Sequence, residues 1–367
     1  MKGEIGQSAA VVLIVAVVVG IVGGMIGYVL KPAEVTPGTT VTVTVPGPTV
    51  TVTVPGPTVT VTAPKRFSGI SIYFFCGGAI GDTFATVVYN GAVAATEDFG
   101  TNTTYEWSGW DPETMVTQFQ QAIAARPDGI CIMGHPGDDA YAPFIKQAED
   151  LGIIVTSVNT TLPANEALYY TKGFGYVGQE LYASGWKLGS ACVTELDLKA
   201  GDRAMVWGLL SQPTRGLRTK GVIDALENVG VTVDYIEITS AINADASLGV
   251  PVCTAYISAH PDVKLIVTDH GSLTATLPTY LSSAGKTPGQ IGAAGFDTLA
   301  PTIAGIKDGW ITCVLDQQQW LQGYLPILQV CLTKLYGFSG LHIDTGAGIV
   351  DSTNYAAVES LSAAGIR

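Results

Sequence analysis

The sequence predicts an α/β protein with two doubly wound parallel-sheet lobes and a ligand cleft between them, preceded by a transmembrane helix and a Thr/Pro-rich stalk. Three observations carry this prediction. Short apolar runs alternate with helical segments from residue 67 onward, an uncharged apolar run lies near the N-terminus, and a Thr-Val-Pro repeat separates the two. With 367 residues, 47% of them apolar and 13% charged, the chain is long enough to bury the cores of two lobes.

The run 9–30, AAVVLIVAVVVGIVGGMIGYVL, predicts a retained single-pass membrane helix. At 1.5 Å per residue it spans about 33 Å, enough for a hydrocarbon core of roughly 30 Å. The run lacks a small-residue cleavage site, which favours a helix that is retained. A signal peptide that is removed is the alternative. Residues 1–8, with Lys2-Gly3, are similar to the prepilin-like signals of archaeal surface proteins. Glycines within the run have a spacing that allows self-association, although Gly is also common in membrane helices: Gly20, Gly23, Gly24 and Gly27.

Residues 31–66 predict an extracytoplasmic spacer. TVTVTVPGP occupies 40–48 and again 49–57, and TVTVTAP follows at 58–64. Thr-Val alternation favours strand, whereas Pro-Gly-Pro interrupts any ladder, so we expect an extended stalk of the kind that often carries O-glycans. Sequons at Asn102 and Asn159 agree with an exported glycoprotein. The domain that follows is then held outside the cell membrane.

The rest of the chain alternates strands with helices. Strands are expected at 71–75, 103–107, 129–133, 153–158, 173–178, 204–210, 231–238, 263–269, 291–297 and 311–316. Helices are expected between them, over 83–98, 113–125, 139–150, 179–193, 215–228, 248–259 and 272–284, then to 308 and to 336. This alternation indicates parallel sheets covered on both faces, and about ten units are too many for one small sheet.

Ligands in such folds bind beyond the carboxyl ends of the strands, so the residues that follow each strand are candidates. In the first half these are Asp82, Phe84, Trp107, His135 and Asn159. Loop aromatics beside carboxylates suit sugars, whose C–H faces stack on rings while their hydroxyls hydrogen-bond. The structural alternatives are a helix N-cap for Asp82, a backbone contact for His135 and a loop folded on its own tryptophans.

In the second half, Arg215 and Arg218 open a helix, where a cation opposes the helix dipole. That placement suggests a purpose such as bidentate bonding to hydroxyls or a carboxylate. The other candidates follow later strands: Asn243, Asp269 with His270, Asp297, and Gln317.

Several classes of function are not expected. Lys and Arg number 18 against 31 Asp and Glu, a net charge of −13, which disfavours a nucleic-acid partner. There is no GxSxG, HExxH or Walker loop, and Cys76 stands where a dinucleotide loop needs its first glycine. Six cysteines without a CxxC pair and four scattered His residues give no metal site. We therefore expect that the protein is not an enzyme and binds no cofactor or metal. We expect the cysteines to be buried free thiols, with a disulfide as the alternative.

From about residue 67 the chain resembles the type I periplasmic sugar-binding proteins, the ribose- and galactose-binding kind that serve ABC importers. AHPDVKLIVTD, GFDTLAP and DQQQWLQGYLP occur in the family's order and spacing, Arg218 to Gly221 forms R-x-x-G, and DTFATVVYNGAVAA is a fair match. The resemblance implies the periplasmic binding protein type I fold. It also implies chain crossings near Gly173, Asp316 and His342, with a first lobe of 67–173 plus 316–341 and a second of 174–315 plus 342–367.

The resemblance also implies roles for single positions. Phe84 matches a stacking aromatic, Arg218 and Asp297 match ligand-binding residues, and Gln317 matches a late glutamine. His135 and either Asp269 or His270 fall at polar contacts. Asn159 stands where many members have Asp, and Thr160 replaces a common Arg, which puts ribose in doubt but keeps the sugar class.

The function implied is an extracytoplasmic solute-binding protein that captures a sugar by hinge closure and delivers it to an ABC transporter permease. Two alternatives remain open. One is a structural or adhesive cell-surface protein on the same fold, and the other is a binding protein for a nucleoside or another small polar solute.

Overall fold

The computed structural model describes residues 40–44, 50–51, 58–62, 65–346 and 348–367, and it divides into two units, 1–65 and 66–367. The expected membrane helix at 9–30 and residues 1–8 lie outside the described residues. Within the described part, no helix combines the length and apolarity needed to cross a bilayer.

In the first unit the Thr-Val repeats pair with one another. β1 (Thr40–Thr44) lies between β2 (Val50–Thr51), its antiparallel neighbour, and β3 (Thr58–Thr62), its parallel neighbour. Thr40 pairs with Thr58, so identical TVTVT segments align in register. These residues have the strand character expected of Thr-Val alternation, but the expectation that Pro-Gly-Pro interrupts any ladder is wrong for them. Pro-Gly-Pro interrupts each run along the chain but does not prevent pairing between repeats.

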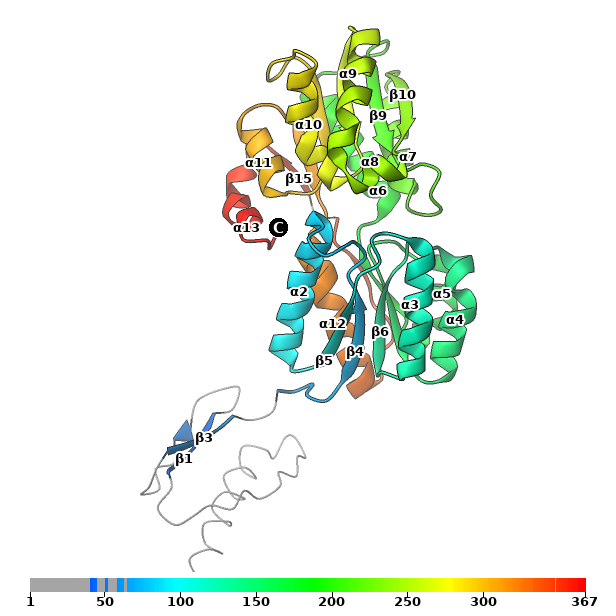
Figure 1. Ribbon diagram of the computed structural model, residues 1–367, viewed down its shortest axis with the longest axis vertical. Helices are drawn as coiled ribbons and strands as arrows, with labels where there is room; N and C mark the ends of the chain where they lie inside the picture. Colours follow the sequence, from blue (N-terminus) through cyan, green and yellow to red (C-terminus); the bar gives the residue numbers. More distant parts are fainter. Residues whose placement is uncertain (1–39, 45–49, 52–57, 63–64, 347) are drawn as a thin grey trace, which may run out of the picture. The chain divides into compact units, whose positions relative to one another are not determined.

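The first lobe is built on a six-stranded, all-parallel sheet with the order β14-β8-β7-β6-β4-β5 (Figure 1). Its strands are β4 (Ser71–Phe75), β5 (Asn102–Glu106), β6 (Gly129–Met133), β7 (Ile154–Val158), β8 (Gly175–Gly178) and β14 (His342–Asp344). Helices α2 (Thr83–Phe99) and α12 (Gln319–Tyr336) cover one face. The other face carries α3 (Pro112–Ala125), α4 (Asp138–Asp150) and α5 (Pro163–Tyr169). β6 and β7 are wholly buried, as central strands between two helical layers must be.

The second lobe repeats the plan with the order β10-β9-β11-β12-β13-β15. Its strands are β9 (Arg203–Gly208), β10 (Thr232–Glu237), β11 (Val263–Thr268), β12 (Gly292–Phe296), β13 (Cys313–Asp316) and β15 (Gly348–Asp351). Helices α6 (Leu181–Glu195) and α7 (Leu217–Glu227) pack on one core, and α9 (Val250–Ala259), α10 (Gly271–Ser283) and α11 (Ala300–Lys307) on the other. Shorter helices are α8 (Ser240–Ala244) and α13 (Glu359–Ala363). Only the edge strand β15 runs antiparallel in this sheet, so the predicted doubly wound architecture is confirmed with that one exception.

The first and last crossings between the lobes lie a few residues further along the chain than expected, whereas the middle crossing lies at Asp316 as expected. β8 pairs with β7, so the chain stays in the first lobe through Gly178 and not to Gly173. β14 pairs with β8, so His342–Asp344 also belongs to the first lobe and the last crossing comes after Thr345. The middle crossing lies between Asp316, the end of β13, and Gln319, the start of α12. Apolar runs mark strands well but do not say which sheet a strand joins.

Two glycines set the close packing of α2 on α12. A Cβ on Gly91 would lie 1.9 Å from the Trp320 carbonyl oxygen, and one on Gly323 would lie 1.9 Å from that of Val88. Backbone thus meets backbone, and only glycine allows that approach. The contact joins α2, whose first turn carries Phe84, to α12, which begins two residues after Gln317.

All six cysteines are buried as free thiols, in agreement with the expectation. Burial, with a contribution from Glu106, raises the pKa of Cys76 to about 12. Such thiols are structural parts of the core.

Candidate functional site

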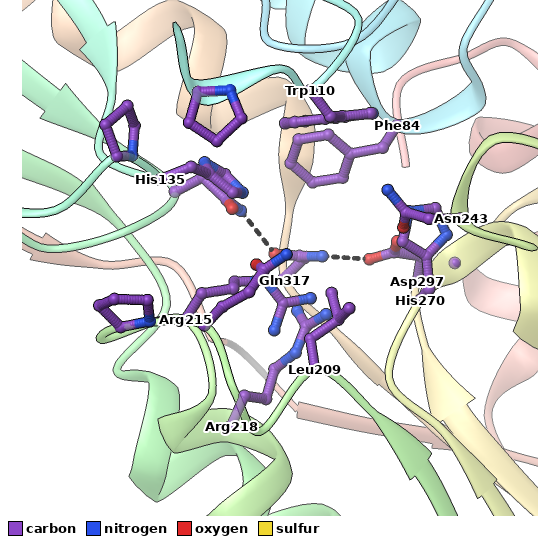
Figure 2. Close-up of a pocket in the computed structure, with 16 residues that line it drawn as sticks. Phe84, Trp110, His135, Leu209, Arg215, Arg218, Asn243, His270, Asp297 and Gln317 are labelled. Atoms are coloured by element: carbon purple, nitrogen blue, oxygen red, sulfur yellow. Dashed lines mark hydrogen bonds between the residues drawn. The ribbon is translucent and has the colours of Figure 1, made fainter. Parts of the chain in front are cut away.

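A cavity of about 210 Å³ lies between the lobes at the carboxyl ends of both sheets (Figure 2). Seven of the predicted site residues line it: Phe84, His135, Asn159, Arg218, Asn243, Asp297 and Gln317. The other lining residues are Trp110, Pro112, Pro136, Leu209, Gln212, Pro213, Arg215, His270 and Gly271. The topology therefore gathers side chains that are far apart in sequence, as the strand-end rule predicts.

The first lobe supplies an aromatic wall. The rings of Phe84 and Trp110 lie 5.6 Å apart, and the His135 ring lies 5.1 Å from that of Trp110. Trp110 Nε1 donates to Asp82 Oδ2 at 2.9 Å, which fixes the indole plane. In Figure 2 the two aromatic side chains lie together on one side of the cavity, facing the arginines on the other. The wall offers an apolar face against which one side of a small ring can stack.

Two predicted residues on this lobe do not line the cavity. Asp82 caps α2, since its Oδ1 accepts from Ala85 N at 2.8 Å, and it contacts the lining residue Trp110 through its other oxygen. Trp107 packs on Tyr89, with ring centroids 5.4 Å apart. Of the two tryptophans in this loop, Trp110 lines the cavity and the predicted Trp107 does not; Ser108 N and Trp110 N both donate to Gly77 O.

The second lobe supplies two buried arginines that share one carboxylate. Arg215 NH1 lies 2.8 Å from Asp269 Oδ2, Arg218 Nε bonds Asp269 Oδ1, and Thr219 Oγ1 donates to Oδ2 at 2.9 Å. Burial alone would raise the pKa of Asp269, but the two arginines outweigh it and hold that pKa below its usual value. Burial and the charge of Arg218 lower the pKa of Arg215 to about 10. Asp269 was predicted to touch the ligand, but it does not line the cavity and instead positions both guanidinium groups, because its oxygens are taken up by them.

A chain of amides joins the two lobes at the floor of the cleft. Gln317 Oε1 accepts from Asn159 Nδ2 at 3.1 Å and from Gln179 Nε2 at 2.8 Å, while Gln317 Nε2 donates to Asp297 Oδ1 (Figure 2). Asn159 belongs to the first lobe and Asp297 to the second. Burial raises the pKa of Asp297 to about 6, although Arg218 and Gln317 oppose that rise.

Three lining residues other than glycine have left-handed backbones: Trp110 (φ 62°), Asn159 (φ 64°) and Asp297 (φ 77°). Side-chain-bearing residues rarely adopt this region, and such strain concentrates at functional sites. Asn159 and Asp297 directly follow β7 and β12, whereas Trp110 lies in the loop after β5.

Two buried polar atoms of the lining residues have no hydrogen-bond partner among the described residues: His135 Nδ1 and Asn243 Oδ1. Buried polar groups are normally paired, so these two indicate where a polar ligand would bond. His270 differs, because its Nδ1 lies 2.7 Å from Ser272 Oγ. Burial and the nearby arginines lower the pKa of His135 to about 3, and burial lowers that of His270 to about 4, so both are neutral at pH 7.

No group of three His, Cys, Asp or Glu side chains in the described ranges is arranged to hold a metal ion. Two further lining residues, Arg215 and His270, are among the candidates that the sequence indicates, whereas Trp110 was missed although it lies three residues from Trp107. The proline and leucine residues that line the cavity have no feature in the sequence that marks them as site residues, because only the packed fold brings them to the cleft.

Buried Asn159 is not accessible as a glycosylation acceptor, whereas Asn102 on edge strand β5 is exposed. The sequon at Asn159 is therefore a coincidence of composition.

Comparison with known proteins agrees with this geometry. Residues 72–331 match the family described as "Periplasmic binding protein domain". The chain is 30% identical over 269 residues to the "Xylose/arabinose-binding protein XylF" of Sulfolobus acidocaldarius, covering 68% of this chain and 64% of that protein. It is 25% identical over 238 residues to the "D-ribose/D-allose-binding protein" of Pseudomonas aeruginosa, covering 64% of this chain and 72% of that protein.

A solved ABC transporter solute-binding protein from Burkholderia graminis, in complex with D-arabinose, superposes with a TM-score of 0.69 at 22% identity. The superposition covers 79% of this chain and 98% of that one. The two sequence relatives are named as sugar-binding proteins and the solved structure as an ABC transporter solute-binding protein, and none of the three is named as an enzyme, in line with the sequence-based expectation. The chain therefore belongs to the periplasmic binding protein domain family and has the two-lobed fold of its sugar-binding members.

Proposed function

We propose that this protein binds a monosaccharide in the cleft between its lobes and presents it, once the lobes have closed, to the permease of an ABC transporter. The observation that carries the proposal is the asymmetric cleft. One lobe offers two adjacent aromatic rings, the other offers arginines and a carboxylate, and two buried polar atoms have no hydrogen-bond partner in the part of the chain that the structure describes. A sugar has an apolar C–H face and a rim of hydroxyls, which matches both walls.

The size of the cavity supports a single sugar ring. About 210 Å³ is smaller than the roughly 300–1,000 Å³ of sites for drug-sized ligands. The relative with the higher identity is named for xylose and arabinose, so pentoses are the first candidates. Phe84 and Trp110 would stack on the ring, and Arg218, Asp297, Asn243 and His135 would bond its hydroxyls.

A thermal-shift screen of the full chain in detergent tests the proposal. The panel contains pentoses, hexoses, disaccharides, nucleosides and amino acids. A ligand at 100 times its Kd should raise the free energy of unfolding by about 2.7 kcal/mol. We expect pentoses or hexoses to shift Tm and disaccharides not to. A nucleoside or amino acid as the only stabilising ligand would overturn the sugar assignment, and no shift with any member would overturn the receptor assignment.

We further propose that 9–30 anchors the protein in the membrane, with the Thr/Pro segment 31–66 as its outer spacer and the Gly-rich helix as a point of self-association. The uncharged 22-residue run supports this proposal. Alkaline carbonate extraction of native membranes tests it. The protein should stay in the membrane pellet, and its release into the supernatant would contradict an integral anchor.

A further inference from the structure

A histidine bridges two carboxylates where the lobes join. His342 lies on β14 at the edge of the first-lobe sheet. Its Nδ1 is 2.7 Å from Glu166 Oε1, on α5 of the same lobe, and its Nε2 bonds Glu180 Oε1. Glu180 is the N-cap residue of α6, the first helix of the second lobe. The imidazole thus connects the two lobes directly.

The backbone around this bridge belongs to the hinge. Glu180 N donates to Asp344 Oδ1 at 3.0 Å, and Gly346 N donates to the same oxygen at 2.8 Å. Gln318 Nε2, on the middle crossing, donates to Thr345 O at 3.0 Å. All three crossings are therefore tied together beside His342, and a rotation of the second lobe must displace Glu180 relative to β14.

The groups around His342 make the bridge depend on its charge. Glu166 faces it from α5, Glu180 from the start of α6 and the ring of Tyr176 from β8 at 5.0 Å, while Asp344 lies two residues away on β14. These neighbours are acidic or neutral. A protonated imidazole donates from both nitrogens, whereas a neutral one donates from one and presents a lone pair to the other carboxylate. Burial lowers the pKa of His342, but the bonds to Glu180 and Glu166 outweigh burial and raise it above its usual value.

We propose that His342, Glu166 and Glu180 form a pH-dependent latch that holds the lobes at the angle seen here while the imidazole is protonated. The sign follows from the bonds. Protonation favours the arrangement that keeps both carboxylates in contact, so the latched population is largest at pH values below the titration of His342. It falls as the pH rises through that titration. The latch involves no ligand contact, so it acts whichever solute the cleft binds.

Energy transfer between two dyes on the ligand-free full chain tests the latch. Keto amino acids at exposed Gln120 on α3 and exposed Asn228 after α7 would carry the dyes and leave the native cysteines untouched. Between about pH 6 and pH 9 we expect the transfer efficiency of the native protein to change with a single titration step. His342→Gln should abolish that step. His260→Gln changes another partly exposed histidine that is distant in sequence from His342, and this variant should retain the titration step.

A second variant covers the case in which His342→Gln does not fold. Glu180→Gln keeps the histidine and removes the second-lobe carboxylate, so it should shrink the step and move it to lower pH. A pH-independent native protein would overturn the latch. So would a step that survives unchanged in whichever of the two variants gives a native-like melting transition.

Discussion

At the scale of single residues, the cleft depends on how each charge is compensated. Asp297 is buried at the end of β12, where Gln317 donates to one oxygen and Arg218 lies nearby. Burial still leaves its pKa raised to about 6. The carboxylate is therefore ionised at pH 7 and able to accept hydrogen bonds, but it is close to losing that ability.

This gives a prediction for pH. Sugar affinity should fall as the pH drops through about 6, because a protonated Asp297 loses acceptor capacity. Asp297→Ala should weaken binding by roughly ten- to a hundredfold, the equivalent of about 1.5–3 kcal/mol for a charge-assisted hydrogen bond. Calorimetric titration across pH checks both points, with exposed Glu113→Gln as the control. An affinity that is equally pH-dependent in Asp297→Ala would contradict this role.

Asp269 gives a prediction for stability. Asp269→Ala should cost about 3–5 kcal/mol of unfolding free energy, because it leaves two buried arginines without their shared partner. Asp262→Ala removes an exposed carboxylate that pairs with Arg203 at 3.1 Å and should cost no more than about 1 kcal/mol. Urea unfolding of both variants measures the difference. Equal losses of unfolding free energy in the two variants would contradict the prediction that the buried cluster contributes more than the exposed pair.

The two tryptophans of one loop give a matched pair. Trp110→Ala should weaken sugar binding by roughly two- to tenfold, since ring stacking contributes roughly 0.5–1.5 kcal/mol. Trp107→Ala should lower Tm and leave affinity within about twofold, because Trp107 packs on Tyr89 outside the cavity. Titration of both variants with the same sugar checks this. The reverse ranking of affinities would show that the cleft is lined differently.

Residue chemistry at strand ends was predictable, but orientation was not. Asp297 and Asn159 follow strands that the apolar runs predict, so their place at the cleft follows from topology alone. Trp107 and Trp110 are three residues apart in one loop, and the sequence does not indicate which of the two side chains lines the cavity. Asp269 was expected to contact the ligand. Nothing in the neighbouring sequence indicates that its carboxylate pairs with two arginines instead.

At the scale of elements, the contact between α2 and α12 sets the geometry of the first-lobe wall. Gly91→Ala should destabilise the fold by roughly 1–3 kcal/mol, because the new Cβ meets the Trp320 carbonyl oxygen. Separation of the two helices would also move Phe84 away from Gln317 and weaken binding. Gly348→Ala, where a Cβ meets nothing within 4 Å, is the control. Thermal unfolding compares them, and equal Tm values would contradict the tight crossing.

Most elements were predictable because buried parallel strands are short, continuous apolar runs. The misplaced ones lack that signal. β14 has three residues with an exposed–intermediate–exposed pattern, and β15 is an antiparallel edge. β8 looked like the start of a second cycle, yet it pairs with β7 because sheet membership is a long-range property. The Thr-Val strands pair because their repeats match in register, which composition alone does not reveal.

At the scale of the whole molecule, two lobes with separate cores meet at a floor of hydrogen-bonded amides. Asn159, Gln317 and Asp297 connect the lobes through side chains, and the three crossings connect them through backbone. A solute that bonds both walls adds contacts only when the lobes are close together. Under the proposed function, its binding energy would therefore shift the population toward the closed form.

The most direct test is calorimetric titration of the full chain with D-xylose, L-arabinose and D-ribose, repeated on Arg218→Ala. We expect saturable heat with one site per chain for at least one of these sugars. We also expect the affinity to drop at least tenfold in Arg218→Ala, while the thermal transition of that variant shows that it is folded. The absence of heat with every sugar, or an affinity unchanged in a folded Arg218→Ala, would contradict sugar capture in this cleft.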